Sequence, residues 1–328
     1  MVFSMQEAKP ILAIDLGGTK IIAAIVSSQG QVVAKESYPT LAGEGPQSVI
    51  DRILFAIDQL LRVRNIDPSQ LNSISIASAG AIDLDQGLVT LSPNLPGWLD
   101  IPLRDIVNRK YRVNTLLIND ASAAALGEYH FGAGRGVNNL IYLTVSTGIG
   151  GGIIINGELY LGPSGSAGEI GHMTIDINGP RCSCGNIGCL ETLASGTAVA
   201  REAIRRIGQG EESSLTDIVE GKIENITAEK VSMAAQGGDS LASDVISEAA
   251  TYLGVGMVNL VNIFNPEMII VGGGVANMGD LLLEPARQVV MERAFKLSAQ
   301  AVRIVPAQLG DDSGLLGAAA FALQQKLD

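Results

Sequence analysis

One pattern of strands and turns occurs twice in this chain, and it restricts the possible folds more than any other feature. In the first copy, apolar segments at residues 11–16 and 20–26 flank a Gly-Gly-Thr turn, and a hairpin leads on to a third strand. In the second copy, segments at 139–145 and 153–155 flank a glycine-rich turn, and an Asn-Gly hairpin again leads to a third strand. The matched turns, roughly 130 residues apart, favour an internal duplication over two unrelated hairpins.

Helical and strand patterns alternate through the rest of the chain. Apolar residues at three- and four-residue spacing predict one helix at residues 46–64, and a longer one at 239–264 that has Ile263 on its inward face. Further strands are expected at 71–77, 113–118, 268–271 and 302–305, and further helices at 121–129, 281–297 and 314–327. This alternation indicates an α/β fold with mixed sheets.

The charge balance excludes several classes of partner. The chain has 34 acidic and 22 basic residues, a net charge of −12, and 47% hydrophobic residues. Such a chain buries a sizeable core, and its negative charge repels nucleic-acid phosphates and anionic lipids, so we expect no nucleic-acid and no membrane partner. The first ten residues lack the apolar core of a secretory signal, and three cysteines are an odd number for a disulfide framework. We therefore expect a cytoplasmic protein.

Glycine accounts for 39 of the 328 residues, about 12% against an average of about 7%, and it gathers at strand ends. Residues 15–20 read Asp-Leu-Gly-Gly-Thr-Lys, a turn whose backbone N–H groups can approach an anion while Asp15 could hold magnesium through water. Alone, this segment is equally well explained as a plain hairpin turn. The second turn, at 146–152, and the three glycines at 272–274 make a polyphosphate site the better interpretation. The spacing is neither that of a Walker loop nor that of a Rossmann fingerprint.

The three cysteines, Cys182, Cys184 and Cys189, lie within eight residues of one another, and His172 lies ten positions upstream. Three thiolates and one imidazole form a closed tetrahedral zinc site of the structural kind. The alternatives are three buried thiols, or one disulfide and a free thiol. Because every cysteine lies in one glycine-rich loop, we favour zinc. The other histidine, His130, is expected on the surface.

Asn119 and Asp120 stand between a predicted strand and the helix that follows it. A carboxylate here could accept a proton from a substrate hydroxyl, as phosphoryl transfer to an alcohol requires, although the sequence alone favours a helix N-cap for Asp120. Glu169 and Glu191 flank the cysteine loop, where plain surface charge is the alternative. Asn94 lies in a proline-rich loop that suits either hydroxyl binding or a hydrophobic lid.

Together these residues resemble the ROK (repressor, open reading frame, kinase) sugar kinases, from residue 11 to the final helix. The motifs that carry the resemblance are the segment 15–20, Asn119-Asp120, Glu169-Ile-Gly-His172 and Cys182-x-Cys184-Gly-x-x-Gly-x-Cys189-x-Glu191. The resemblance implies an actin-like, hexokinase-like (ribonuclease H-like) duplicated fold of two α/β domains around an interdomain cleft. We expect an N-terminal domain at 1–118, with the last helix, about 312–328, packed back onto it, and a larger C-terminal domain with the zinc loop at 119–311.

The resemblance also implies roles for individual residues. Asp120 would be the catalytic base. Sugar hydroxyls would be held by Gly80, Asn94, Asn119, Asp120, Glu169, His172 and Glu191. Nucleotide would be held by Asp15, Gly17, Gly18, Thr19, Lys20, Thr147, Gly148, Gly272, Gly273 and Gly274, and zinc by His172, Cys182, Cys184 and Cys189. Two positions depart from the family's pattern: Ser122 stands where Asn is usual, and Ala79 stands where Pro is common.

The function implied is ATP-dependent phosphorylation of the 6-hydroxyl of glucose, with magnesium as cofactor, structural zinc shaping the sugar loop, and a homodimer or homotetramer as the assembly. N-acetylmannosamine, N-acetylglucosamine and fructose stay open as sugars, since pocket shape decides between them. The rival is a sugar-responsive transcriptional repressor of the same family. We expect the kinase, because the motif at Asp15 leaves little room before it for a DNA-binding domain and the net charge is −12. Asp120 disfavours a third reading, an inactive sugar-binding protein.

Overall fold

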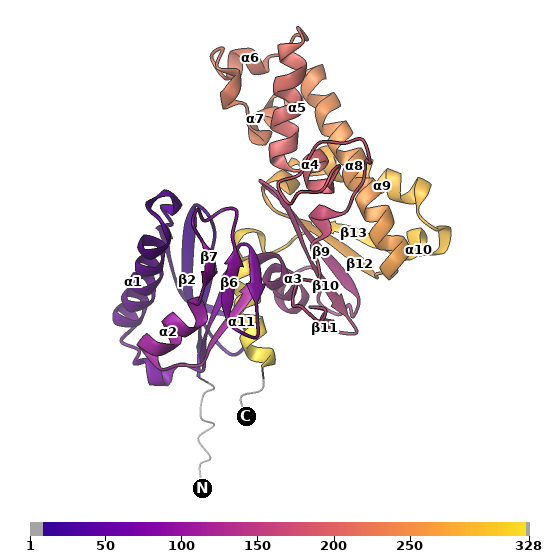
Figure 1. Ribbon diagram of the computed structural model, residues 1–328. Coiled ribbons are helices and arrows are strands. Elements are labelled where there is room, and N and C mark those ends of the chain that lie inside the picture. The colour runs from indigo at the N-terminus through magenta and orange to yellow at the C-terminus, as the bar shows by residue number, and fades with distance from the viewer. Residues whose placement is uncertain (1–8, 326–328) are drawn as a thin grey trace.

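Two five-stranded sheets with the same topology form the centre of the structure (Figure 1). The computed structural model describes residues 9–325. The first sheet has the order β3-β2-β1-β4-β8, from β1 (Ile11–Leu16), β2 (Lys20–Val26), β3 (Val32–Pro39), β4 (Ser73–Ser78) and β8 (Thr115–Asn119). The second has the order β11-β10-β9-β12-β13, from β9 (Leu140–Val145), β10 (Ile149–Ile155), β11 (Glu158–Leu159), β12 (Met268–Gly272) and β13 (Arg303–Pro306).

The strand directions repeat as well. In each sheet three successive strands pair antiparallel, and two more continue the sheet in parallel. Since order and direction agree strand by strand, the duplicated α/β fold expected from the sequence is confirmed. A small third sheet, β5-β6-β7, was not expected; its strands are β5 (Ala81–Asp83), β6 (Leu88–Leu91) and β7 (Leu99–Ile101).

Helices cover both sheets. The longer ones are α1 (Pro46–Arg64), α2 (Leu103–Tyr111), α3 (Asp120–Phe131), α5 (Gly196–Gly208), α7 (Ala228–Gln236), α8 (Ser240–Phe264), α9 (Asp280–Arg293) and α11 (Ser313–Gln324). The shorter ones are α4 (Leu190–Ala194), α6 (Leu215–Ile218) and α10 (Lys296–Ala301), with 3₁₀ turns η1 (Ala42–Glu44), η2 (Pro68–Gln70), η3 (Ile170–His172), η4 (Ile223–Asn225), η5 (Gly274–Met278) and η6 (Gly310–Asp312). In the described part of the chain, none of them has both the length and the hydropathy that a bilayer crossing requires.

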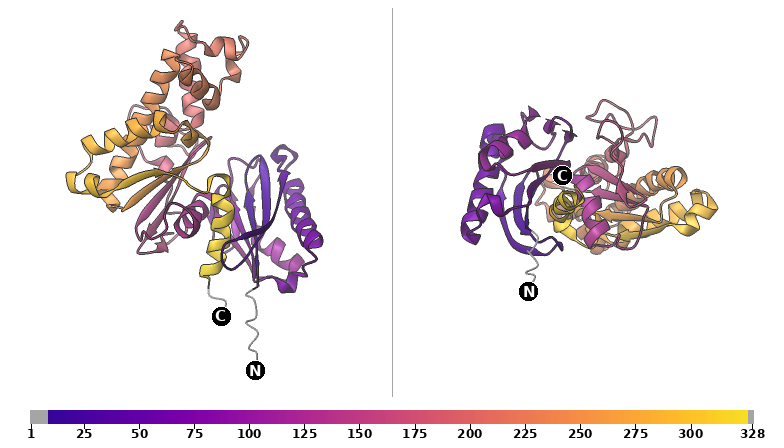
Figure 2. Two further views of the ribbon diagram at one scale, coloured as in Figure 1. Left: turned by 180° about the vertical axis from the view of Figure 1, so that it is seen from behind. Right: turned by 90° about the horizontal axis from the view of Figure 1, so that it is seen from below.

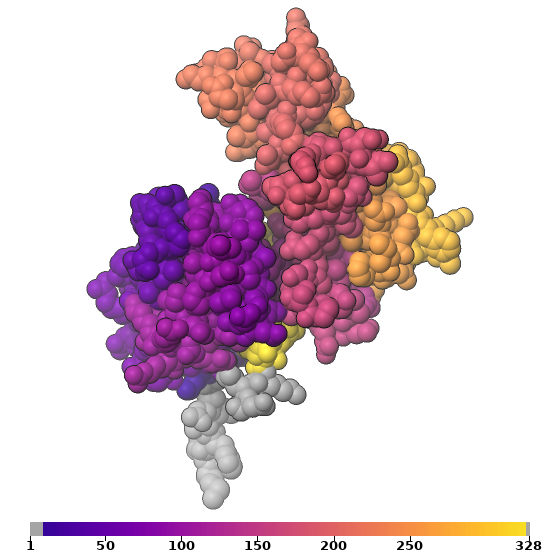
Figure 3. All heavy atoms as spheres, viewed as in Figure 1, coloured from indigo at the N-terminus to yellow at the C-terminus, as the bar shows by residue number. Residues whose placement is uncertain are grey.

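Alternate residues of the central strands belong to different hydrophobic layers, as the two-residue period of a strand requires. In β1, Leu12 packs with the buried face of α1, whereas Ile11 packs with α3 and α11. In β9, Ile141 packs with α8 and α9, whereas Tyr142 packs with α3 and α11. The pair α3 and α11 therefore forms a layer shared by both sheets, and Figure 2 shows it between the two lobes. In Figure 3 a notch separates the lobe of the first sheet from the helices α5 to α7.

Helices α3 and α11 cross at very short range because glycines lie at the contact. A Cβ atom built on Gly317 would lie 1.6 Å from the carbonyl oxygen of Ala123, and one on Gly127 would lie 2.3 Å from that of Ser313. Any larger residue would force the helix backbones apart. This crossing fixes how the two lobes are joined.

Three expectations about secondary structure were wrong. Strand β10 begins at Ile149, not at 153, so the glycines lie inside the strand. A Cβ on Gly152 would lie 2.5 Å from Ala125 Cβ, and the lack of a side chain there lets α3 pack on the strand. The helix expected at 281–297 is two helices, α9 and α10, separated at Ala294 and Phe295. Ile263 is 70% exposed rather than inward, because it lies at the last turn of α8, beyond the layer it was expected to face.

Replacing Gly317 by Ala should destabilise the protein by at least about 2 kcal/mol, because the new Cβ overlaps the α3 backbone. Urea unfolding followed by circular dichroism measures the change. The matched control is Gly208→Ala, a helical glycine at which an added Cβ meets no atom within 4 Å. An equal loss of stability in both variants would contradict the close crossing.

Candidate active site and metal centre

Asn119 caps helix α3 and so leaves Asp120 free of that role. The Asn119 side-chain oxygen accepts the N–H groups of Ala121 (3.0 Å) and Ser122 (3.1 Å). Its amide nitrogen donates to the Gly80 carbonyl at 3.0 Å. The N-cap role favoured for Asp120 by the sequence alone was therefore wrong. Asp120 is the first residue of the helix, partly exposed, with its carboxylate accepting the N–H of Ala121 at 2.8 Å.

A second carboxylate, that of Asp15, lies close to Asp120 at the end of β1. Burial raises the pKa of Asp15 to about 7; the negative charge of Asp120 adds to this, and Lys20 opposes it. Burial likewise raises the pKa of Asp120 to about 6; the N–H of Ala121 lowers it, and the charge of Glu169 raises it. A divalent cation beside these carboxylates would relieve their repulsion, so the pair suits magnesium held through water.

Lys20 lies in an ion pair that the sequence did not predict. Its ammonium contacts the carboxylate of Asp311 at 2.7 Å, and the next acid along the chain, Asp312, pairs with Lys35. The charge of Lys20 lowers the pKa of Asp311. Both pairs are partly exposed, so each adds little stability. They connect η6, just before α11, to the end of the first Gly/Thr turn through Lys20 and to β3 through Lys35.

A small cavity of about 110 Å³ lies where β12 and β13 end. It is lined by Val271, Gly272, Gly273, Gly274, Ala276, Asn277, Pro306, Ala307, Gly310 and Asp311. Gly273 has φ +87°, and a Cβ there would lie 2.5 Å from the Val145 carbonyl oxygen. The glycines therefore let the end of β12 close onto the end of β9, beside the turn that begins at Ser146.

The second Gly/Thr turn is tied to Glu191. The carboxylate of Glu191 accepts the N–H of Ile149 at 2.9 Å, and a Cβ on Gly148 would lie 2.3 Å from the same oxygen. On the other side of the turn, the Thr197 hydroxyl donates to the Thr147 carbonyl at 2.7 Å. Glu191, expected beside the sugar, thus also fixes the turn expected beside the nucleotide.

The first Gly/Thr turn packs on the loop that carries Asn94. A Cβ on Gly18 would lie 2.9 Å from the Asn94 carbonyl oxygen. Leu95 and Trp98 are buried in the first hydrophobic core, whereas Asn94 itself is exposed. Apolar residues therefore anchor this loop, while the hydroxyl-binding role of Asn94 stays a prediction.

Four predicted metal ligands converge. The ligand atoms of His172, Cys182, Cys184 and Cys189 all lie within 4.8 Å of one another, and the three cysteines are free thiols. Cys184 Sγ and Cys189 Sγ are 3.8 Å apart, and Cys182 Sγ and His172 Nδ1 are 3.7 Å apart. Tetrahedral zinc with Zn–S bonds of about 2.3 Å puts two sulfurs about 3.8 Å apart. The donors therefore fit zinc, and they fill all four positions, as in a structural site.

His172 connects the metal centre to the candidate sugar side. Its Nδ1 faces Cys182, while its Nε2 lies 3.9 Å from the carboxylate of Glu169. Helix α4 begins directly after Cys189 and carries Glu191 in its first turn. One loop thus presents Glu169, His172 and Glu191, and a bound metal would hold that loop in place.

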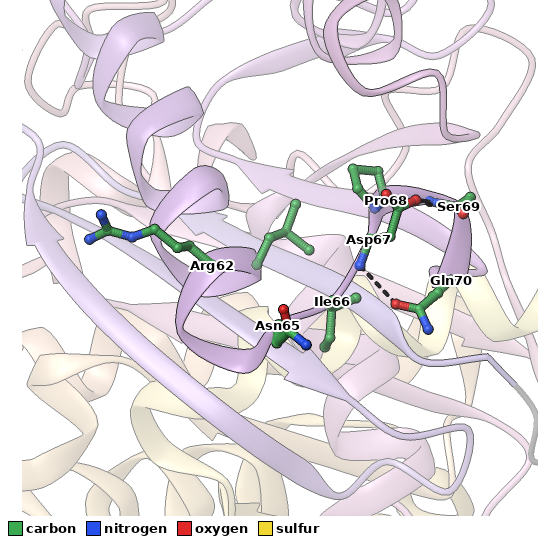
Figure 4. A pocket seen from close by; sticks show the side chains of 8 residues that line it. Arg62, Asn65, Ile66, Asp67, Pro68, Ser69 and Gln70 are labelled. Carbon is green, nitrogen blue, oxygen red and sulfur yellow. Dashed lines mark hydrogen bonds between the residues drawn. The ribbon is translucent and has the colours of Figure 1, made fainter.

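A larger hollow, of about 720 Å³, lies away from all of these residues (Figure 4). Residues 61–62 and 65–70, at the end of α1, line it. Its walls are a turn closed by its own hydrogen bonds, with the N–H of Asp67 donating to Gln70 at 2.8 Å. None of the residues proposed for chemistry lies in it.

Comparison with known proteins agrees with this site. The sequence model of the ROK family matches residues 11–325. The chain belongs to the ROK family. Among its relatives is a glucokinase of Halalkalibacterium halodurans, 38% identical over 96% of this chain and 95% of that one. Another is a xylose repressor of Caldicellulosiruptor bescii, 36% identical over 98% of this chain but 80% of the repressor.

A solved structure shares the fold of this ROK protein. It is a ROK family glucokinase from Streptomyces griseus in complex with glucose and AMPPNP, with a TM-score of 0.83 and 35% identity. The match covers 96% of this chain and 99% of that one. The actin-like, hexokinase-like architecture expected for the chain is thereby confirmed.

The purified protein should contain one zinc ion per chain, and Cys184→Ser should lose most of it, because three protein ligands hold a structural zinc far less tightly than four. Elemental analysis by mass spectrometry gives the zinc content, and thermal melting gives the stability. Ser183→Ala, at the neighbouring position, is the control and should keep its zinc. A folded, metal-free wild-type protein would rule out the site.

Proposed function

We propose that this ROK protein is an ATP-dependent sugar kinase that phosphorylates the 6-hydroxyl of glucose. One observation carries the proposal: Asn119 takes over the capping of α3, so the Asp120 carboxylate stands at the helix start beside Asp15. A free carboxylate at this place can accept a hydroxyl proton, and an adjacent one can hold magnesium. The glucose and AMPPNP bound to the Streptomyces griseus relative support the same pair of substrates.

Each part of the site then has a proposed role. Asp120 is the catalytic base, and the sugar hydroxyls contact Gly80, Asn94, Asn119, Glu169, His172 and Glu191. The nucleotide lies along Asp15, Gly17, Gly18, Thr19, Lys20, Thr147 and Gly148, with its base near Gly272, Gly273 and Gly274. Zinc, held by His172, Cys182, Cys184 and Cys189, contributes to folding of the sugar loop and does not touch the phosphates.

The protein forms no covalent bond to either substrate in the proposed reaction. Asp120 takes the proton of the sugar 6-hydroxyl while the oxygen of that hydroxyl attacks the γ-phosphorus of ATP, and ADP leaves. Magnesium held through water at Asp15 would supply positive charge to the phosphates, and backbone N–H groups of the glycine turns would donate to them. The main contribution of the chain is therefore to hold the two substrates in line while closure of the lobes excludes water.

The organisation of the protein follows the same proposal. We propose an N-terminal domain at 1–118 that is completed by the segment at about 312–328, which contains α11, and a C-terminal domain at 119–311; residues 1–8 and 326–328 lie outside the described part of the chain. We further propose a homodimer or homotetramer in the cytoplasm. Exposed apolar side chains on α9, on α10 and between them, among them Met291 (58%), Phe295 (67%) and Leu297 (72%), support a subunit interface there.

A second candidate function is a sugar-responsive regulator, because the Caldicellulosiruptor bescii relative is a xylose repressor. A regulator must bind sugar but needs neither a catalytic base nor a polyphosphate site. The cluster of Asp15, Asp120 and three glycine turns therefore favours the kinase. A panel of glucose, N-acetylmannosamine, N-acetylglucosamine, fructose and xylose, assayed with ATP and magnesium, separates these possibilities. Turnover of none of them would defeat the kinase proposal.

Asp120→Asn should lower kcat for glucose by about a thousandfold or more, because an amide cannot accept the hydroxyl proton. Glucose binding, measured by calorimetry, should change little, since the amide keeps the size of the side chain and one acceptor oxygen, and its NH₂ group can donate to a sugar hydroxyl. Asp217→Asn, which alters an exposed acid in the first turn of α6, is the control and should keep full activity. Equal kcat in Asp120→Asn and wild type would exclude Asp120 as the base.

The pH profile should reflect the raised pKa of the base. Asp120 acts only when deprotonated, and its pKa is raised to about 6 by burial. Activity should therefore be nearly full above neutral pH and fall as the pH drops through about 6, with bound magnesium moving this limb to lower pH. Initial rates at saturating ATP from pH 4 to 8 give the profile. A rate that is flat down to pH 4 would contradict this assignment.

A further inference from the structure

Glu128, in the third turn of α3, is fully buried and takes no part in the chemistry proposed above. The N–H groups of Ala133, Gln308 and Leu309 and the hydroxyl of Ser313 donate to its carboxylate, at 2.8 to 3.2 Å. A buried carboxylate is strongly destabilising without such donors, so this arrangement is specific. Three of the four donors lie some 180 residues away in the sequence.

Two of those distant donors, Gln308 and Leu309, belong to the segment between β13 and α11, which we call the 308–312 loop, and the third, Ser313, begins α11. Within it, Gly310 and Asp311 line the cavity together with the glycines at the end of β12. Asp311 also pairs with Lys20 of the first Gly/Thr turn. The loop is therefore one wall of the cavity assigned to the nucleotide, and Glu128 accepts the N–H groups that begin it.

The same carboxylate is linked to the opposite wall. The side chain of Tyr142, in β9, lies near Glu128: burial raises the pKa of its hydroxyl, and the charge of Glu128 adds to this. That hydroxyl lies 2.3 Å from where a Cβ on Gly272 would be, so it touches the backbone of the β12 glycines. Position 132 must be glycine for this arrangement, because a Cβ there would lie 2.1 Å from the carboxylate of Glu128. No residue of this network touches the sugar side described above.

We propose that Glu128 is a positioning residue for the nucleotide: it fixes the 308–312 loop against the end of β12, on the same helix that begins at Asp120. The inference rests on the proposed function, since it assumes that the cavity takes ATP. It follows that Glu128 should affect binding of the nucleotide and leave binding of the sugar alone. A residue that only stabilised the fold would not separate the two.

Glu128→Gln tests this with the least change in shape. Its NH₂ group cannot accept, so at least one buried N–H loses its partner, and KM for ATP should rise about tenfold. KM for glucose should change by less than about twofold. The dissociation constant of a non-hydrolysable ATP analogue, measured by calorimetry, should rise like the KM for ATP.

Glu267→Gln is the matched control. Glu267 also accepts backbone N–H groups, those of Asn138 and Asn139, but at the other end of β9 and β12, away from the glycines. It should lower the melting temperature and leave both KM values unchanged. The proposal is overturned if folded Glu128→Gln keeps the wild-type KM for ATP, or raises both KM values equally.

Two further outcomes are decided in advance. If Glu128→Gln does not fold, Ser313→Ala replaces it: a higher KM for ATP alone supports the proposal, and unchanged KM values overturn it. If the wild-type protein phosphorylates no sugar, the proposed function has failed, and calorimetry alone tests Glu128. In that case weaker analogue binding by Glu128→Gln, but not by Glu267→Gln, supports the inference, and equal binding overturns it.

Discussion

The close crossing of α3 and α11 is the contact on which the rest of this structure depends. Gly127 and Gly317 let the two helix backbones touch, and the helices then pack against both sheets at once. Helix α3 starts with Asp120, and α11 begins two residues after Asp311, so one crossing brings together the candidate base and a wall of the cavity proposed for the nucleotide. A looser crossing would move these groups independently.

The metal centre fixes the loop proposed to bind the sugar, just as the helix crossing fixes the segments proposed to bind the nucleotide. A loop with few apolar residues has little reason to adopt one conformation, and four ligands around one zinc supply that reason. Because His172 faces Cys182 with one ring nitrogen and Glu169 with the other, the position of the metal sets the position of a candidate sugar contact. Glu191, on the helix that follows the metal loop, then fixes the turn at Gly148 by accepting the N–H of Ile149.

Much of the fold was predictable because its signals are local. The strands on either side of the first Gly/Thr turn and helix α1 have the predicted bounds, since alternation and three- to four-residue spacing are properties of neighbouring residues. The start of β10 was missed because glycine is common both in turns and at close contacts: Gly150 and Gly152 lie against α3, and Gly151 lies against Ile170 on the other face of the strand. The strands of the third sheet were missed because two of them have only three residues, too few to show a period.

The sequence by itself determined which chemical groups are present and in which local segments they lie: the carboxylates at strand ends, the glycines in turns and the cysteines in one loop. Only the tertiary structure decided which of these groups contact one another. Asn119, not Asp120, caps α3; Lys20 pairs with Asp311; and Glu128 accepts N–H groups of the 308–312 loop, which lines the cavity. The physical reason is that each of these outcomes depends on a hydrogen bond, a charge or a steric contact in three dimensions. Such contacts join residues up to 291 positions apart, and no local pattern records them.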